Sequence, residues 1–93
     1  MEIENNREQI DVLDKKILDL LNQRARHVVA IGQYKRANNM PVFDAKREQN
    51  LLSKIKDLNP GPFSSEAVED IFKAIIKESR ELEDNLRSNC SSC

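Results

Sequence analysis

A long amphipathic stretch without proline, residues 4–38, constrains the fold of this chain more than any other feature. Its apolar residues recur at three- and four-residue steps, the spacing of one helix face. They are Ile10, Leu13, Ile17, Leu20, Leu21, Val28 and Ile31. At about 1.5 Å rise per residue such a helix is a rod of roughly 50 Å, whereas a compact chain of this length has a diameter of roughly 30 Å. We therefore expect a second chain to cover the protruding part, in a two-fold dimer.

Two cationic residues lie on the same face as the apolar stripe. Arg24 follows Leu20 and Leu21, and Lys35 comes about three turns later, within about 20° of Arg24 around the helix. Buried cations without partners are costly, so a site here would have to supply anions, from acidic side chains or from a ligand. The alternative is that both side chains reach solvent or pair with Asp and Glu.

A second helix is predicted after the break at residues 38–41, where two asparagines precede Met40 and Pro41. Asp44 is well placed to cap it, and apolar residues at helical spacing extend it from Ala45 to about Leu58.

A third helix is predicted after the strongest break of the chain, Asn59-Pro60-Gly61-Pro62. Ser64 or Ser65 starts this helix, which is expected to end at about Leu86. The fold class is therefore all-α, with three helices per chain (long, short, medium) in an intertwined helical homodimer. We expect a single domain over residues 1–93, of which about 87–93 form a flexible tail.

The composition argues against several classes of partner. Lys plus Arg number 15 and Asp plus Glu number 16, with no separate basic block, so nucleic acid is an unsuitable partner. No apolar run could span a bilayer and no leader follows Met1, so we expect a soluble cytoplasmic protein without membrane contact. Cys90 and Cys93 lie in the frayed tail, without nearby histidines to complete a zinc site.

The remaining polar residues favour ligand positioning over covalent chemistry. His27, the only histidine, lies next to Arg26 in mid-helix and is interpreted as a surface or seam residue. The third helix carries Ser79 and Glu83 within its apolar stripe. A serine there usually bonds back to a carbonyl one turn earlier, and Glu83 could equally turn outward toward Arg80 or Arg87.

The cations Arg24 and Lys35, with Asp44, Glu48, Ser79 and Glu83 as neighbours, suit a small dianionic ligand. Its reaction would need positioning and charge stabilisation. We expect no metal and no cofactor.

A set of residues in fixed order and spacing resembles the all-helical (AroQ) chorismate mutases over about residues 7–86. The set is Arg7, Ile10, Asp14, Ile17, Leu20, Leu21, Arg24, Gly32, Lys35, Pro41, Val42, Asp44, Arg47, Glu48, Ile75, Ile76 and Ser79. The resemblance implies an isomerase that rearranges chorismate to prephenate, a unimolecular Claisen step on the route to phenylalanine and tyrosine. It also implies a homodimer with two sites and no covalent intermediate.

By the same resemblance, four cations bind the substrate. Arg24 and the partner subunit's Arg7 would hold the carboxylates, Lys35 would bond a carboxylate and the ether oxygen, and Arg47 would add positive charge. Arg7 lies roughly 25 Å along the helix from Arg24 and about 100° around it. Both can reach one small molecule only if Arg7 comes from a second, antiparallel helix.

The resemblance assigns the polar residues as well. Asp44 and Glu48 would receive the ring hydroxyl, Ser79 would assist a carboxylate, and Glu83 would be the second donor to the ether oxygen. Glu83 stands where most bacterial members have glutamine and fungal members have glutamate.

Two alternatives remain from the sequence. Isochorismate-pyruvate lyases share this fold and much of its cationic site. A non-enzymatic helical dimerisation module explains the apolar stripes, but not the placement of four cations together. The 93 residues are expected to leave no room for a fused dehydratase or dehydrogenase domain.

Overall fold

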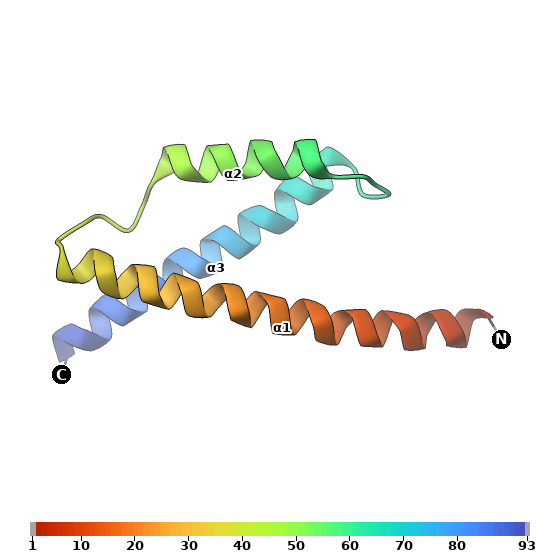
Figure 1. Ribbon diagram of the computed structural model, residues 1–93, viewed down its shortest axis with the longest axis horizontal. Coiled ribbons are helices and arrows are strands. Elements are labelled where there is room, and N and C mark those ends of the chain that lie inside the picture. The colour runs from red at the N-terminus through yellow and green to blue at the C-terminus, as the bar shows by residue number, and fades with distance from the viewer. Residues whose placement is uncertain (1, 93) are drawn as a thin grey trace.

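The computed structural model describes residues 2–92, with side chains described through residue 85. It contains three helices, α1 (Glu2–Ala37), α2 (Ala45–Leu58) and α3 (Ser65–Ser92), and no strand among residues 2–92 (Figure 1). The predicted all-α fold with long, short and medium helices is confirmed. Helix α3 continues to Ser92, beyond the predicted end near Leu86. No proline or glycine follows Pro62 in the sequence, so no residue of these types stops the helix earlier. The thiols of Cys90 and Cys93 lie outside the described side chains.

Helix α1 is a rod whose N-terminal half projects away from the other two helices (Figure 1). The chain measures 55 × 29 × 14 Å, and its radius of gyration is 16.6 Å, against about 12 Å for a compact chain of this length. Three residues of the predicted stripe, Ile10, Leu13 and Ile17, are each 53% exposed. The rod therefore extends beyond what its own chain can cover, as the sequence predicts.

Side-chain caps define where the two shorter helices begin. Asp44 Oδ1 accepts a hydrogen bond from the backbone nitrogen of Arg47 at 3.0 Å, which fixes the start of α2. Ser64 Oγ accepts one from the backbone nitrogen of Ala67 at 3.1 Å, which identifies Ser64 as the cap of α3. Both starts agree with the predicted positions.

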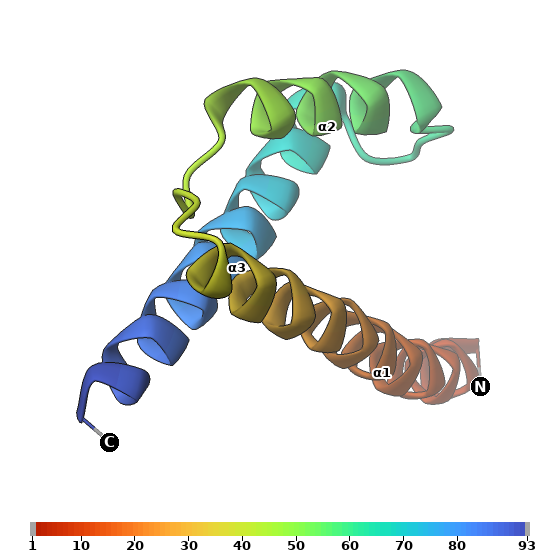
Figure 2. The same ribbon diagram turned by 60° about the vertical axis from the view of Figure 1, so that its left-hand side comes forward.

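Helices α1 and α2 both pack on α3, and within the described residues they do not pack on each other (Figure 2). The small core consists of Val28 from α1 and of Val68 and Ile76 from α3, each 8% exposed. Helix α2 has no buried residue. Residues of all three helices line a cleft between α1 and α2, with α3 as its floor.

No helix of the described part of the chain combines the length and the apolar character that crossing a bilayer requires.

Candidate active site

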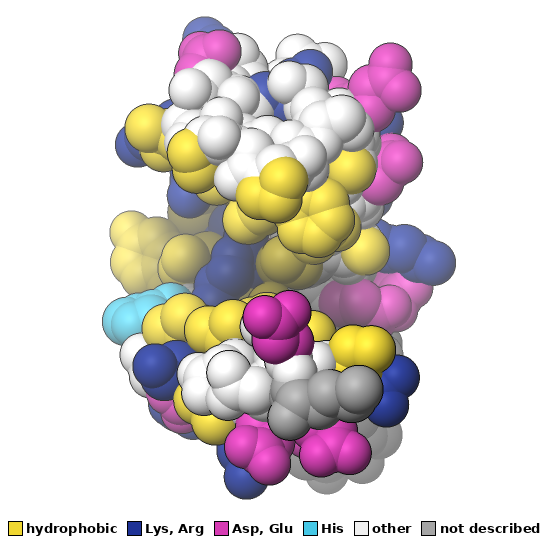
Figure 3. Space-filling view, turned by 90° about the vertical axis from the view of Figure 1, so that its right-hand side faces the viewer, with side chains coloured by type: hydrophobic (Ala, Val, Ile, Leu, Met, Phe, Trp, Pro, Cys, Tyr) yellow, Lys and Arg dark blue, Asp and Glu magenta, His cyan; other side chains and the backbone are white. Residues whose placement is uncertain are grey.

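The cleft contains a pocket of about 350 Å³ lined by residues of all three helices, a size within the range of small-molecule sites. Figure 3 looks along α1 from its N-terminal end and shows hydrophobic and dark blue Lys and Arg side chains in the hollow above α1. The lining includes seven of the eight predicted site residues: Arg24, Lys35, Asp44, Arg47, Glu48, Ser79 and Glu83.

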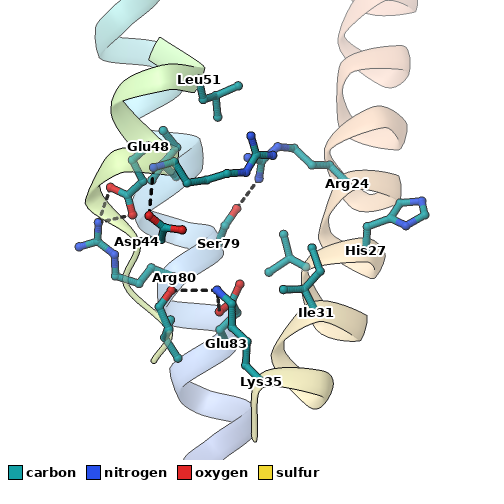
Figure 4. A pocket seen from close by; sticks show the side chains of 14 residues that line it. Arg24, His27, Ile31, Lys35, Asp44, Glu48, Leu51, Ser79, Arg80 and Glu83 are labelled. Carbon is teal, nitrogen blue, oxygen red and sulfur yellow. Dashed lines mark hydrogen bonds and ion pairs between the residues drawn. The ribbon is translucent and has the colours of Figure 1, made fainter. Parts of the chain in front are cut away.

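Arg24 reaches from α1 across the cleft to α3 (Figure 4). Its Nη1 donates a hydrogen bond to Ser79 Oγ at 2.6 Å. The Ser79 hydroxyl also donates a hydrogen bond to the backbone oxygen of Ile75, one helical turn earlier, at 2.7 Å. This is the bond expected for a serine inside a helix. Ser79 thus fixes the guanidinium inside the pocket, and the alternative that Arg24 reaches solvent is wrong.

Lys35, in the last turn of α1, also points inward. Its Nζ lies 3.5 Å from Glu83 Oε2 and donates a hydrogen bond to the backbone oxygen of Val42 at 3.0 Å. The Lys35 side chain is 18% exposed. Both stripe cations therefore point inward as predicted, and Lys35 also has the acidic partner that the alternative interpretation allowed.

Glu83 is the one buried charged residue among the described side chains, at 8% exposure. It faces Lys35, so the alternative that it turns outward toward Arg80 is wrong; the side chain of Arg87 lies outside the described residues. Glu83 Oε2 is buried and forms no hydrogen bond with the described residues. Glu83 Oε2 thus keeps hydrogen-bonding capacity on the pocket wall, next to Lys35.

Arg80 is a pocket residue that the sequence analysis did not place in the site. Its Nη2 lies 2.6 Å from both carboxylate oxygens of Glu48, and its guanidinium carbon lies 4.3 Å from the centre of the Phe43 ring. A signal was available, because Arg80 lies one helical turn before Glu83 and so flanks the same face of α3.

The other predicted residues lie at the rim or outside the pocket. Asp44 and Arg47 are exposed and line the pocket at the start of α2. Arg7 is exposed on the projecting half of α1 and does not line the pocket of its own chain. His27 is an exposed rim residue and points away from the labelled site residues, which agrees with its interpretation as a surface residue (Figure 4).

The charges of the lining favour an anionic ligand. Four Lys and Arg residues and three Asp and Glu residues line the pocket, which leaves one net positive charge. Among the described residues, no group of three His, Cys, Asp or Glu side chains could hold a metal ion.

A family model described as chorismate mutase type II matches residues 6–84. The chain belongs to this chorismate mutase family. The sequence-based recognition of an all-helical chorismate mutase is thereby confirmed. All seven predicted site residues in the pocket fall within the matched segment.

Relatives of this chorismate mutase domain agree with the family. It is 41% identical over 73 residues to a bifunctional chorismate mutase/prephenate dehydratase of Neisseria gonorrhoeae, a match over 78% of this chain and 20% of that protein. It is 36% identical over 90 residues to the protein of the same description from Aquifex aeolicus, over 92% of this chain and 25% of that protein. The chain thus spans about a fifth to a quarter of the length of these curated relatives.

Solved structures of chorismate mutases match this domain over most of both chains. Form II of the Thermus thermophilus enzyme has a TM-score of 0.89 at 37% identity, over 90% of this chain and 96% of that one. The Helicobacter pylori enzyme in complex with prephenate has a TM-score of 0.82 at 29% identity, over 89% of this chain and 90% of that one.

Proposed function

We propose that this chain is a chorismate mutase that rearranges chorismate to prephenate. The observation that carries the proposal is the pocket of about 350 Å³ in which Arg24 and Lys35 reach inward to fixed polar partners. Membership of the chorismate mutase type II family and the likeness to a prephenate complex support the same activity.

The proposed mechanism relies on charge stabilisation and positioning. As the C–O bond of chorismate breaks, negative charge develops on the ether oxygen, so a donor there stabilises the transition state more than the substrate. Lys35 is the first donor in this proposal, and a protonated Glu83 is the second. Lys35 Nζ and Glu83 Oε2 lie 3.5 Å apart on the pocket wall, so both could contact one ligand atom beside them.

Binding of the carboxylates orients the substrate. Arg24, assisted by Ser79, holds one carboxylate, and Arg47 adds positive charge at the rim. With its side chain held over the ring, the substrate becomes a near-attack conformer, which removes much of the entropic part of the barrier. Asp44 and Glu48 receive the ring hydroxyl.

The site is proposed to be completed by the partner subunit's Arg7 in a homodimer. Arg7 does not line the pocket of its own chain, so it could contact this ligand only from a second subunit. The exposed stripe of α1, in which Leu20 is 61% exposed, supports a second α1 packed against it.

Purified protein incubated with chorismate tests the proposal, with loss of chorismate absorbance and formation of prephenate as readouts. The protein is produced in a host strain without its own chorismate mutase, and a Lys35→Ala preparation is the matched blank. Isochorismate, with pyruvate as the measured product, tests the lyase alternative. If neither substrate is consumed, the dimerisation-module alternative replaces the enzyme.

A further inference from the structure

Arg80 joins three segments at the edge of the pocket, and the proposed reaction gives it no role. It projects from α3, contacts both oxygens of Glu48 on α2 at 2.6 Å, and lies over the ring of Phe43 in the segment before α2. Figure 4 shows the Arg80 and Glu48 side chains meeting at the pocket wall. Arg80 therefore links α3 to α2 and to the segment before α2.

The Glu48 carboxylate has no other described partner that would hold it in place. Helix α2 has no buried residue and packs only on α3 within the described residues. A glutamate side chain has considerable rotamer freedom, and fixing it in one position costs entropy. A charge-assisted contact to both oxygens offsets this cost and selects one position.

We infer that Arg80 is a positioning residue that holds the Glu48 carboxylate ready to accept the substrate's ring hydroxyl. This inference rests on the proposed function. A carboxylate accepts hydrogen bonds at about four lone-pair positions, so the single Arg80 nitrogen leaves others for a hydroxyl. Phe43 in turn supports the guanidinium, because a cation is attracted to the face of an aromatic ring.

Arg80 also balances charge beside the ligand. Without it, the lining has three cations and three acidic residues, and the Glu48 carboxylate is an unpaired anion near a dicarboxylate. The ring hydroxyl does not react, so its contact to Glu48 is equally strong in the substrate and in the transition state. Loss of such uniform binding raises KM and leaves kcat nearly unchanged.

A double-mutant cycle of Arg80→Met and Glu48→Gln on the full chain tests the inference. We expect Arg80→Met to raise KM for chorismate roughly tenfold or more, the scale of one lost hydrogen bond to a charged group. In the Glu48→Gln background the same substitution should raise KM far less, because residues that act through one contact are non-additive. Arg80→Lys keeps a positive charge and should restore part of the loss.

The matched control is the ion pair between Lys56 and Glu69, at 3.2 Å, which also joins α2 to α3 but lies outside the pocket lining. Lys56→Met removes that pair, and we expect its KM to equal the wild-type value. Thermal unfolding of both variants reports how much each loosens the helices. If Lys56→Met raised KM as much as Arg80→Met, the effect would come from general attachment of α2, and the positioning role would be overturned.

The remaining outcomes separate this inference from the proposed function. An active wild type in which the Arg80→Met and Glu48→Gln effects simply add would overturn the inference and leave the mutase activity standing. A folded wild type that does not consume chorismate would overturn the proposed function and this inference with it.

Discussion

Lys35 of α1 and Glu83 of α3 face each other across the pocket, with Nζ 3.5 Å from Oε2 (Figure 4). The lysine nitrogen is also bonded to the backbone oxygen of Val42 at 3.0 Å, so the cation is held in place by the chain itself. Glu83 is 8% exposed. A cation fixed in advance stabilises developing negative charge effectively.

Lys35→Ala is expected to lower kcat/KM by about a hundredfold or more, the scale of losing a preorganised donor to a developing oxyanion. Steady-state kinetics with chorismate measures the loss, and circular dichroism should show unchanged helix content. Arg36→Ala is the control, since it removes an exposed cation from the next position of the same helix turn. Near-normal activity of Lys35→Ala would make Lys35 a structural residue.

Arg24→Ala should also cost about a hundredfold or more in kcat/KM, because it removes the guanidinium that is proposed to bind a carboxylate. Ser79→Ala should cost less, roughly tenfold, because it leaves that charge in place and removes only the hydroxyl bonded to it. Measuring kcat/KM of both variants in the same kinetic assay gives their order. A larger loss for Ser79→Ala than for Arg24→Ala would contradict the proposed division of roles.

Glu83→Gln is expected to keep activity and to change its pH dependence. A carboxyl group donates a hydrogen bond only when protonated, whereas an amide donates at every pH. The ratio of variant to wild-type kcat/KM should therefore rise with pH, which a series of assays across about pH 5 to 8 measures. A ratio independent of pH would mean that Lys35 acts on the ether oxygen without Glu83.

The chain is expected to be a homodimer whose α1 helices pack against each other. Ile10, Leu13 and Ile17 are each 53% exposed in a single chain, and covering them is favourable by about 25 cal/mol for each Å² of apolar surface. Sedimentation equilibrium at micromolar concentration measures the mass. A folded and active monomer there would contradict both the dimer and the shared site.

Mixing two inactive variants, Arg7→Ala and Lys35→Ala, should restore activity after subunit exchange. In a mixed dimer one site combines an intact Lys35 with the partner subunit's intact Arg7, and the other site has lost both. Random exchange makes half of the dimers mixed, so recovery should approach about a quarter of wild-type activity. Without recovery under verified exchange, Arg7 would lie outside the partner's site.

The sequence by itself determined the helices and the direction of the α1 cations. Asp44 and Ser64 mark the starts of α2 and α3 because capping depends on a few neighbouring residues. Arg24 and Lys35 point the same way because the period of one helix fixes the angle between them. The long α1 likewise predicted an extended chain, since its length follows from its residue count.

The tertiary structure alone decided which charges meet between helices. From the sequence, Glu83 could face inward or pair with Arg80, because either direction suits a residue of α3. In the structure Glu83 faces Lys35, and Arg80 pairs with Glu48 of α2. The period of a helix fixes angles within that helix, whereas the place of α2 relative to α3 depends on the packing of apolar side chains across the chain. That packing brings together residues 32 positions apart, and no local pattern specifies such a pair.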